Sequence, residues 1–176
     1  AWAWRTALER ADGPVGLALT RQNLPTYERG PGKFNNADGV ARGGYVLAEA
    51  DGGSPQVILI GTGSEVQLCV AARELLAQEG IKARVVSLPC REWFDEQDES
   101  YRTSVLPKTV RARVSVEAAV GQGWRELVGD AGRIISIEHY GASADYKTLF
   151  REFGFTPEKV VAAAKDSIAA AAAPIV

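Results

Sequence analysis

The sequence predicts an α/β fold in which helices cover both faces of a mostly parallel sheet. Residues 57–60 (VILI) form an apolar run that is too short for a helix and rich in β-branched side chains, as is typical of a strand buried on both faces. Residues 83–88 form a second such run, and apolar residues at helical spacing lie between the two. A strand, a helix and a strand within about thirty residues form a right-handed crossover with parallel strands. Because a parallel sheet needs helices on both faces, we expect a three-layer α/β/α domain.

The helix between these strands has start and stop signals. Residues 61–63 (GTG) break the first strand, and Ser64 stands three residues before Gln67, which is the spacing of a capping box. Gly80 occupies the position of a C-terminal cap glycine. The apolar stripe between these signals consists of Leu68, Cys69, Ala72, Leu75 and Leu76.

Composition excludes several classes of partner. The chain has 20 basic and 22 acidic residues without a basic block, so we expect no nucleic-acid partner. No apolar run approaches the roughly 20 residues that span a bilayer, and no signal peptide is visible, so we expect no membrane partner and a cytoplasmic location. Cys69 and Cys90 are interpreted as a reduced intracellular pair, and a single histidine, His139, argues against a metal cluster.

The N-terminal sequence AWAWRTALER has helical periodicity, with Trp4, Ala7 and Leu8 on one face. No capping residue precedes it and the chain contains no Met. We therefore expect a C-terminal piece of a longer protein, cut by proteolysis or by design. A processed N-terminus that frays is the alternative.

A candidate ligand contact follows the next predicted element. Residues 15–20 (VGLALT) are predicted to form a buried strand, and Arg21 comes directly after it. Ligands of α/β sheets are bound just past the carboxyl ends of strands, and a guanidinium can grip a phosphate or carboxylate at two points. A surface arginine that closes a strand end is the other explanation, and the residues alone favour it.

Residues 25–40 are rich in Pro, Gly and Asn and have no hydrophobic period, so we expect a linker between two domains. Residues 45–47 (YVL) then predict a short strand at a sheet edge. The first helix and strand thus belong to one domain, and everything after about residue 40 belongs to a second.

Further elements follow the second strand of the crossover. Trp93 and Phe94 are expected to pack into the core beneath the edge of the sheet. Glu117, at a predicted strand end, is either a half-exposed carboxylate or a contact at a subunit or domain interface. The expected elements are a helix at 97–106, a strand at 111–116, a short helix at 124–128 and a buried strand at 134–137.

Two helices close the chain. Asp145 should cap the first helix, and Thr156 with Pro157 should start the second. The alanine-rich tail, residues 169–176, is expected to fray. The inward side chains are expected to be Tyr146, Leu149, Phe150 and Phe153 on the first helix, and Val160, Val161, Ala164 and Ile168 on the second.

The residues show no self-contained active site. The GTG turn is like the start of a dinucleotide fingerprint, but Val66 stands at the position of its third glycine, so a tight strand-to-helix turn explains it. Glu138 and His139 are neighbours on a predicted strand and should point to opposite faces, which argues against an acid–base pair. No nucleophile elbow or phosphate-cradling loop is found.

Several separated segments nevertheless resemble transketolase, in that family's order, over about residues 1–164. The resemblance implies that residues 1–24 end a pyrimidine-binding domain, that 25–40 are a linker, and that 41–176 are a C-terminal domain with a mostly parallel five-stranded sheet. The segments are LALTRQNLP, ARGGYVL, ILIGTGSEVQLCVAARELLAQEGIKARVVSLP, FDEQDESYRTSVLP, RVSVEA, HYGASA and FREFGFTPEKVV.

The resemblance also implies a function for the parent protein. Transketolases are homodimeric transferases that use thiamine diphosphate and a divalent metal such as Mg²⁺ to move a two-carbon ketol unit from a ketose phosphate to an aldose phosphate in the pentose phosphate pathway. The family's catalytic, cofactor-binding and metal-binding residues match none here, so we expect no bound cofactor and no activity from this chain alone. Arg21 matches the arginine of the family's RQN motif, which contacts the sugar phosphate, and is therefore expected to bind substrate.

Two other classes stay open. The chain could be a regulatory module that holds a small molecule at the strand ends near residues 61–64 and Glu117. It could instead be the dimer-interface module of another thiamine-diphosphate-dependent enzyme. The RQN motif and the ARGGYVL segment favour transketolase over the related oxo-acid dehydrogenase β-subunit.

Overall fold

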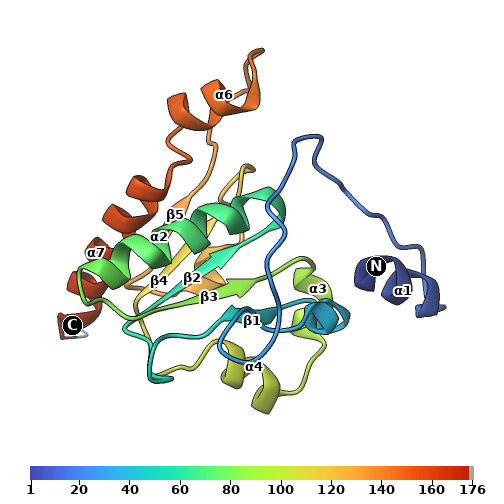
Figure 1. Cartoon of the computed structure of the whole chain (residues 1–176), viewed down its shortest axis with the longest axis horizontal. Helices are drawn as coiled ribbons and strands as arrows, with labels where there is room; N and C mark the ends of the chain where they lie inside the picture. Colours follow the sequence, from blue (N-terminus) through green and yellow to red (C-terminus); the bar gives the residue numbers. More distant parts are fainter. Residues whose placement is uncertain (175–176) are drawn as a thin grey trace.

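The computed structural model describes residues 1–174 and contains one five-stranded sheet in the order β1-β3-β2-β4-β5 (Figure 1). The central strands pair in parallel, and β1 joins the edge in antiparallel fashion. The predicted fold class and the edge position of residues 45–47 are therefore confirmed. The strands are β1 (Tyr45–Ala48), β2 (Val57–Gly61), β3 (Ala83–Ser87), β4 (Arg113–Val116) and β5 (Arg133–Ile135).

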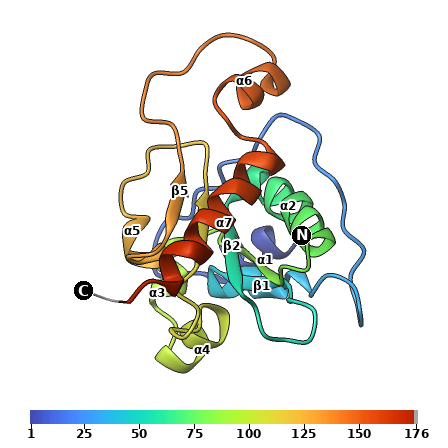
Figure 2. The same ribbon diagram turned by 90° about the vertical axis from the view of Figure 1, so that its left-hand side faces the viewer.

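Helices cover both faces of this sheet (Figure 2). Val57 and Leu59 of β2 belong to the apolar cluster formed with α2 and α7, whereas Ile58 and Ile60 belong to the cluster on the opposite face. All four side chains are fully buried, as expected for a strand of a doubly covered parallel sheet. The first layer is α2 (Val66–Gln78) and α7 (Pro157–Ala172), and the second is α3 (Arg91–Asp95), α4 (Glu99–Val105) and α5 (Arg125–Val128).

The helix α1 (Trp2–Glu9) lies outside these layers, beside the short 3₁₀ helix η1 (Ala37–Arg42). Its end is fastened to the domain by Arg10. One guanidinium nitrogen of Arg10 donates to both carboxylate oxygens of Glu96 at 2.8 Å, and the guanidinium lies over the ring of Trp93 at 5.0 Å. Residues 10–24, called the arm below, continue from this attachment.

The arm corrects one prediction. Residues 15–20 pair with no strand of the described chain, and Leu19 is 74% exposed, so the predicted buried strand is wrong. The apolar run is real, but a strand also needs neighbours for its backbone groups, and no other strand of residues 1–174 lies beside it. Arg21 therefore does not follow a strand end in this structure.

The predicted linker carries more structure than its composition indicates. The rings of Tyr27 and Phe34 lie 4.5 Å apart and both pack against the core. Asn35 pairs with the outer edge of β1, because its backbone N–H donates to the Leu47 carbonyl at 2.9 Å and its side chain donates to the Val46 carbonyl at 3.0 Å. These bonds cover part of an edge strand that would otherwise expose its backbone.

The start of α2 differs from the capping box that the sequence predicts. Ser64 lies in a 3₁₀ turn, η2 (Gly63–Glu65), and its hydroxyl donates to the Glu65 carboxylate instead of accepting a backbone bond. The turn is closed by the Glu65 N–H, which donates to the Thr62 carbonyl at 3.0 Å. The cap at Gly80 is confirmed, with a φ of 76°.

The C-terminal region confirms some predictions and corrects others. Asp145 and Thr156 cap their helices as expected. The helix α6 (Tyr146–Glu152) has no fully buried residue, but Phe150 and Phe153 pack against the core cluster whereas Tyr146 is 39% exposed, so the prediction of a core-facing helix holds in part. The last strand is shorter than expected and only half-buried, because it forms the edge of the sheet.

The tail is more ordered than its alanine content predicts. The helix α7 continues to Ala172, and Arg111 donates to the carbonyls of Ala171 and Ala173, so fraying from residue 169 is wrong. Residues 175–176 lie outside the described residues. Ser167, which the apolar pattern missed, is fully buried and anchors α7 because its hydroxyl bonds to the backbone of Arg113 and Ala131.

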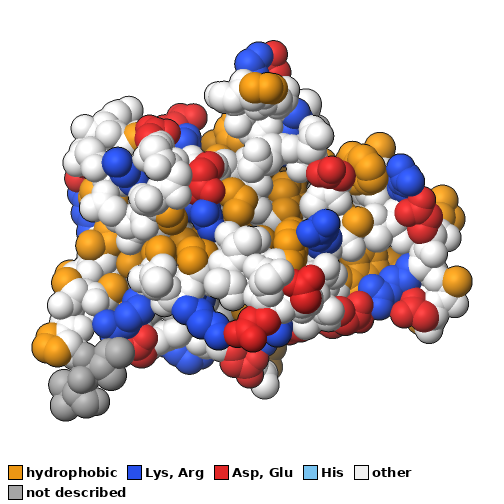
Figure 3. Space-filling view, turned by 90° about the horizontal axis from the view of Figure 1, so that it is seen from below, with side chains coloured by type: hydrophobic (Ala, Val, Ile, Leu, Met, Phe, Trp, Pro, Cys, Tyr) orange, Lys and Arg blue, Asp and Glu red, His pale blue; other side chains and the backbone are white. Residues whose placement is uncertain are grey.

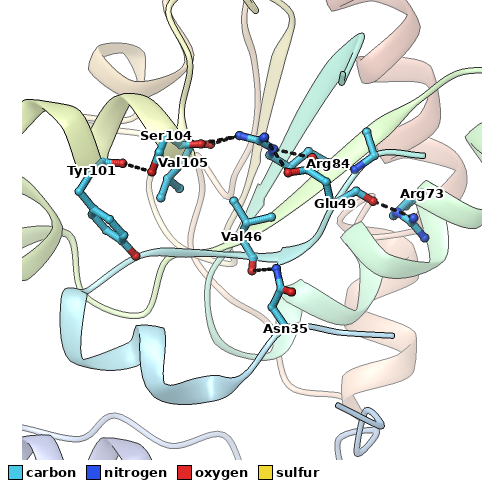
Figure 4. Close-up of polar contacts among 9 residues, drawn as sticks. Asn35, Val46, Glu49, Arg73, Arg84, Tyr101, Ser104 and Val105 are labelled. Carbon is cyan, nitrogen blue, oxygen red and sulfur yellow. Dashed lines mark hydrogen bonds and ion pairs between the residues drawn. The ribbon is translucent and has the colours of Figure 1, made fainter. Parts of the chain in front are cut away.

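Arg84 of β3 forms hydrogen bonds with the segment after β1 and with the end of α4, on the face of the sheet that α4 covers (Figure 4). Its guanidinium donates to both carboxylate oxygens of Glu49, at 2.9 and 2.7 Å, just after β1. It also donates to the carbonyls of Ser104 and Val105, at 2.8 and 2.9 Å, where α4 ends. These carbonyls are among the unpaired acceptors at a helix C-terminus, which a cation stabilises.

We expect Arg84→Ala to lower the free energy of unfolding by about 3 kcal/mol, because it removes the cationic partner of the Glu49 carboxylate and the side-chain donor to two carbonyls. Arg84→Lys should recover only part of this, since a point charge cannot reach all four acceptors. Urea denaturation at pH 7 measures both. Lys165→Ala, which breaks an ion pair with Glu79, is the control and should cost less than about 1 kcal/mol. Equal losses for Arg84→Ala and Lys165→Ala would contradict the assignment.

Candidate functional site

The sheet topology marks one position as the place for a site. From β2 the chain passes through α2 to β3, which is the neighbour of β2 on one side. From β4 it passes through α5 to β5, which lies toward the other edge of the sheet. The helices α2 and α5 cover opposite faces of the sheet. β2 and β4 are neighbours, so their carboxyl ends flank the point where the topology switches, and ligands of open α/β sheets bind at such crevices. Thr62 and Glu117 are the first residues past these two strands.

Glu117 is held by two donors. The hydroxyl of Thr62 donates to Oε1 at 3.1 Å, and the indole Nε1 of Trp124 donates to Oε2 at 2.9 Å. The carboxylate is half-buried and forms no ion pair within residues 1–174. The interpretation of Glu117 as a half-exposed carboxylate at a strand end agrees with this position.

A cavity of about 440 Å³ opens at these strand ends. The arm forms one wall through Val15 and Leu17, and Leu88 and Trp93 form apolar parts of the opposite side. Thr62, Glu117, Gln122 and Trp124 line the polar part. The arm, which lies over the carboxyl edge of the sheet, therefore closes one side of the cavity.

Two buried groups near the switch point have altered proton affinity. The pKa of Glu65, 6% exposed, is raised above its ordinary value, mainly because burial disfavours the carboxylate; Glu117 raises it further, while the Ser64 hydroxyl acts in the opposite direction. Burial also raises the pKa of the Cys69 thiol, so Cys69 is a packing residue rather than a nucleophile.

The other candidate residues do not gather at the cavity. Arg21 is exposed and is not among the lining residues. Glu138 accepts from the Gly121 N–H at 2.9 Å, whereas the ring of His139 packs on Phe153, so these two side chains make different contacts. Sequence reasoning missed Trp124 as a partner of Glu117, although a lone tryptophan in a glycine-rich loop after a strand-end carboxylate is a usable signal.

The described residues do not fit a metal centre. Within residues 1–174 no group of three or more His, Cys, Asp or Glu side chains could hold a metal ion. None of the helices in this part of the chain has the length and apolar character needed to cross a membrane. On the face shown in Figure 3, basic and acidic side chains are interspersed rather than gathered in one basic patch.

Comparison with known proteins assigns this architecture. Residues 43–156 match the family model described as the transketolase-like TK C-terminal domain. The chain belongs to this transketolase family. It is 63% identical over 172 residues to the transketolase of Mycobacterium leprae and 52% identical over 164 residues to transketolase 1 of Escherichia coli. These alignments cover 94% and 93% of the chain but 24% of each relative, so the chain spans about a quarter of the length of the transketolases it matches.

Solved transketolases share the fold. A structure of the Pichia stipitis enzyme in complex with fructose 6-phosphate superposes with a TM-score of 0.84 at 39% identity, covering 96% of this chain and 23% of that one. The superposed part includes nearly the whole chain, and not only the α/β domain.

We expect Glu65→Gln to stabilise the chain more at pH 7 than at pH 4. The pKa of Glu65 is raised on folding, so the stability that this residue contributes is complete below its unfolded pKa and is lost as the pH rises through its folded pKa. Glutamine does not titrate and escapes that loss. The melting temperatures of both proteins between pH 4 and 7 test this, with Glu74→Gln, an exposed change on the same helix, as the control. A pH-independent difference would show that desolvation of Glu65 does not govern it.

Proposed function

We propose that this chain is part of a transketolase and that the whole enzyme transfers a two-carbon ketol unit from a ketose phosphate to an aldose phosphate. The main support for this proposal is the family match, together with relatives whose sequences are more than half identical to the chain. Structures of the Pichia stipitis transketolase with fructose 6-phosphate, sedoheptulose 7-phosphate and xylulose 5-phosphate support sugar phosphates as the substrate class.

The proposal includes thiamine diphosphate and a divalent metal such as Mg²⁺ in the whole enzyme. When bound, the cofactor supplies the electron sink for breaking a carbon–carbon bond. The described residues offer no metal cluster, so the metal centre is not assigned to them. The contribution of this chain is instead to bind and orient substrate.

Arg21 is the residue of this chain that we propose to contact substrate. Its side chain is exposed, and no hydrogen bond or ion pair occupies its guanidinium within the described residues, whereas its neighbour Gln22 bonds to Thr20. A free guanidinium can donate to two phosphate oxygens at once. The phosphate of a sugar phosphate is remote from the breaking bond, so its contact should persist equally in the ground and transition states.

In the full-length enzyme we therefore expect Arg21→Ala to raise KM for sugar phosphates about ten- to hundredfold with a smaller fall in kcat, because uniform binding is lost. Steady-state kinetics with phosphorylated and unphosphorylated acceptors measures the effect. Acceptors without phosphate should be nearly indifferent, and Arg21→Lys should recover only part of the loss. Arg5→Ala, an exposed change on α1, is the control. Equal losses on both acceptor types would make Arg21 a structural residue.

The 176-residue chain alone should not transfer a ketol group, since it spans about a quarter of its relatives and brings no metal centre within the described residues. Purified chain is incubated with thiamine diphosphate, Mg²⁺, xylulose 5-phosphate and ribose 5-phosphate, with the full-length enzyme as the positive control. Turnover above blank would overturn this expectation.

We further propose that the parent enzyme is a homodimer that acts in the cytoplasm in the pentose phosphate pathway. These points rest on the family resemblance. Sedimentation of the full-length enzyme tests the dimer, because a monomeric mass at micromolar concentration contradicts it.

A further inference from the structure

We propose that the cavity at the switch point binds a small organic monocation, an amidinium or ammonium carried on an apolar body, with Glu117 as its counter-ion. The proposal goes beyond ketol transfer and does not depend on it. It concerns a place and a charge that the sugar-phosphate contact at Arg21 does not use.

The first argument is the position and size of the cavity. It lies past the carboxyl ends of the neighbouring strands β2 and β4, where open parallel sheets bind ligands. Its volume of about 440 Å³ falls within the range of small-molecule sites. Val15, Leu17, Leu88 and Trp93 provide apolar walls on both sides.

The second argument is the charge of the lining. Arg91, Glu92 and Glu117 are the lining side chains that carry formal charge. The guanidinium of Arg91 is already engaged by Asp95, by Glu126 and by the Gly123 carbonyl at 2.9 Å. Neither glutamate has a cationic partner within residues 1–174. The cavity is therefore suited to a cation and unsuited to a phosphate.

The third argument is the free capacity of the Glu117 carboxylate. Thr62 and Trp124 each occupy one acceptor position, one on each oxygen, and thereby fix the plane of the carboxylate. A carboxylate has about four acceptor positions, so one on each oxygen remains. The two parallel N–H groups of an amidinium match such a pair of oxygens.

Benzamidinium is the probe, because benzamide and benzoate are a neutral and an anionic compound of nearly the same shape. The readout is the indole N–H signal of Trp124 in ¹H–¹⁵N spectra of the 176-residue chain, assigned with Trp124→Phe among the four tryptophans. We expect a saturable shift with benzamidinium, at least tenfold weaker binding of benzamide, and no shift with benzoate. Equal binding of the three compounds would overturn the proposal.

Variants test the counter-ion. Glu117→Gln keeps an acceptor oxygen for Trp124 or Thr62 and should weaken benzamidinium binding about tenfold, whereas the exposed Glu158→Gln should leave it unchanged. Leu17→Arg places a cation in the cavity wall and should weaken binding of the cationic probe similarly. Because Leu17 lies on the arm and not in the sheet, this variant serves as the test if Glu117→Gln proves unstable. Unchanged binding in folded Glu117→Gln, or in Leu17→Arg, would contradict the role of Glu117.

Discussion

The burial of β2 on both faces is the constraint on which the other layers depend. Its four apolar side chains point alternately into two separate clusters and are fully buried, so helices must cover both faces of the sheet to keep them from water. Its backbone pairs in parallel with β3 and β4, and parallel neighbours can be joined only by crossovers. These crossovers leave in opposite directions and bring Thr62 and Glu117 together at one edge.

The central unit could be predicted because its signals are local. The apolar runs at β2 and β3, the stripe on α2 and the glycine at position 80 lie within a single crossover, and each reports on its own backbone. The prediction of a strand at residues 15–20 is wrong because a strand needs neighbouring strands, which a local sequence pattern cannot show. The prediction for α6 holds only in part for a related reason: apolar spacing shows that the helix has an apolar face but not how deeply that face is covered, and Phe150 packs against the core while Tyr146 is exposed.

The candidate site was predictable in its position and not in its composition. Strand ends near residues 61–64 and Glu117 follow from the order of elements, and the structure places them together. The bond from Trp124 comes from the start of another helix, and the cavity wall comes from an arm about 100 residues away in sequence, as Val15 and Glu117 illustrate. Such pairings depend on the path of the chain between elements, which periodicity does not encode.

The attachment of the arm by Arg10 gives this cavity a property that a pocket inside a rigid domain would lack. Arg10 contacts Glu96 and the ring of Trp93, which are distant from it in sequence, and through these two contacts the arm is held on the domain. The Arg10–Glu96 ion pair lies at the surface, and the contribution of a surface ion pair falls as the salt concentration rises. The wall formed by Val15 and Leu17 is thus tied to an interaction that weakens as ionic strength rises, and the closure of the cavity becomes a function of the surrounding salt.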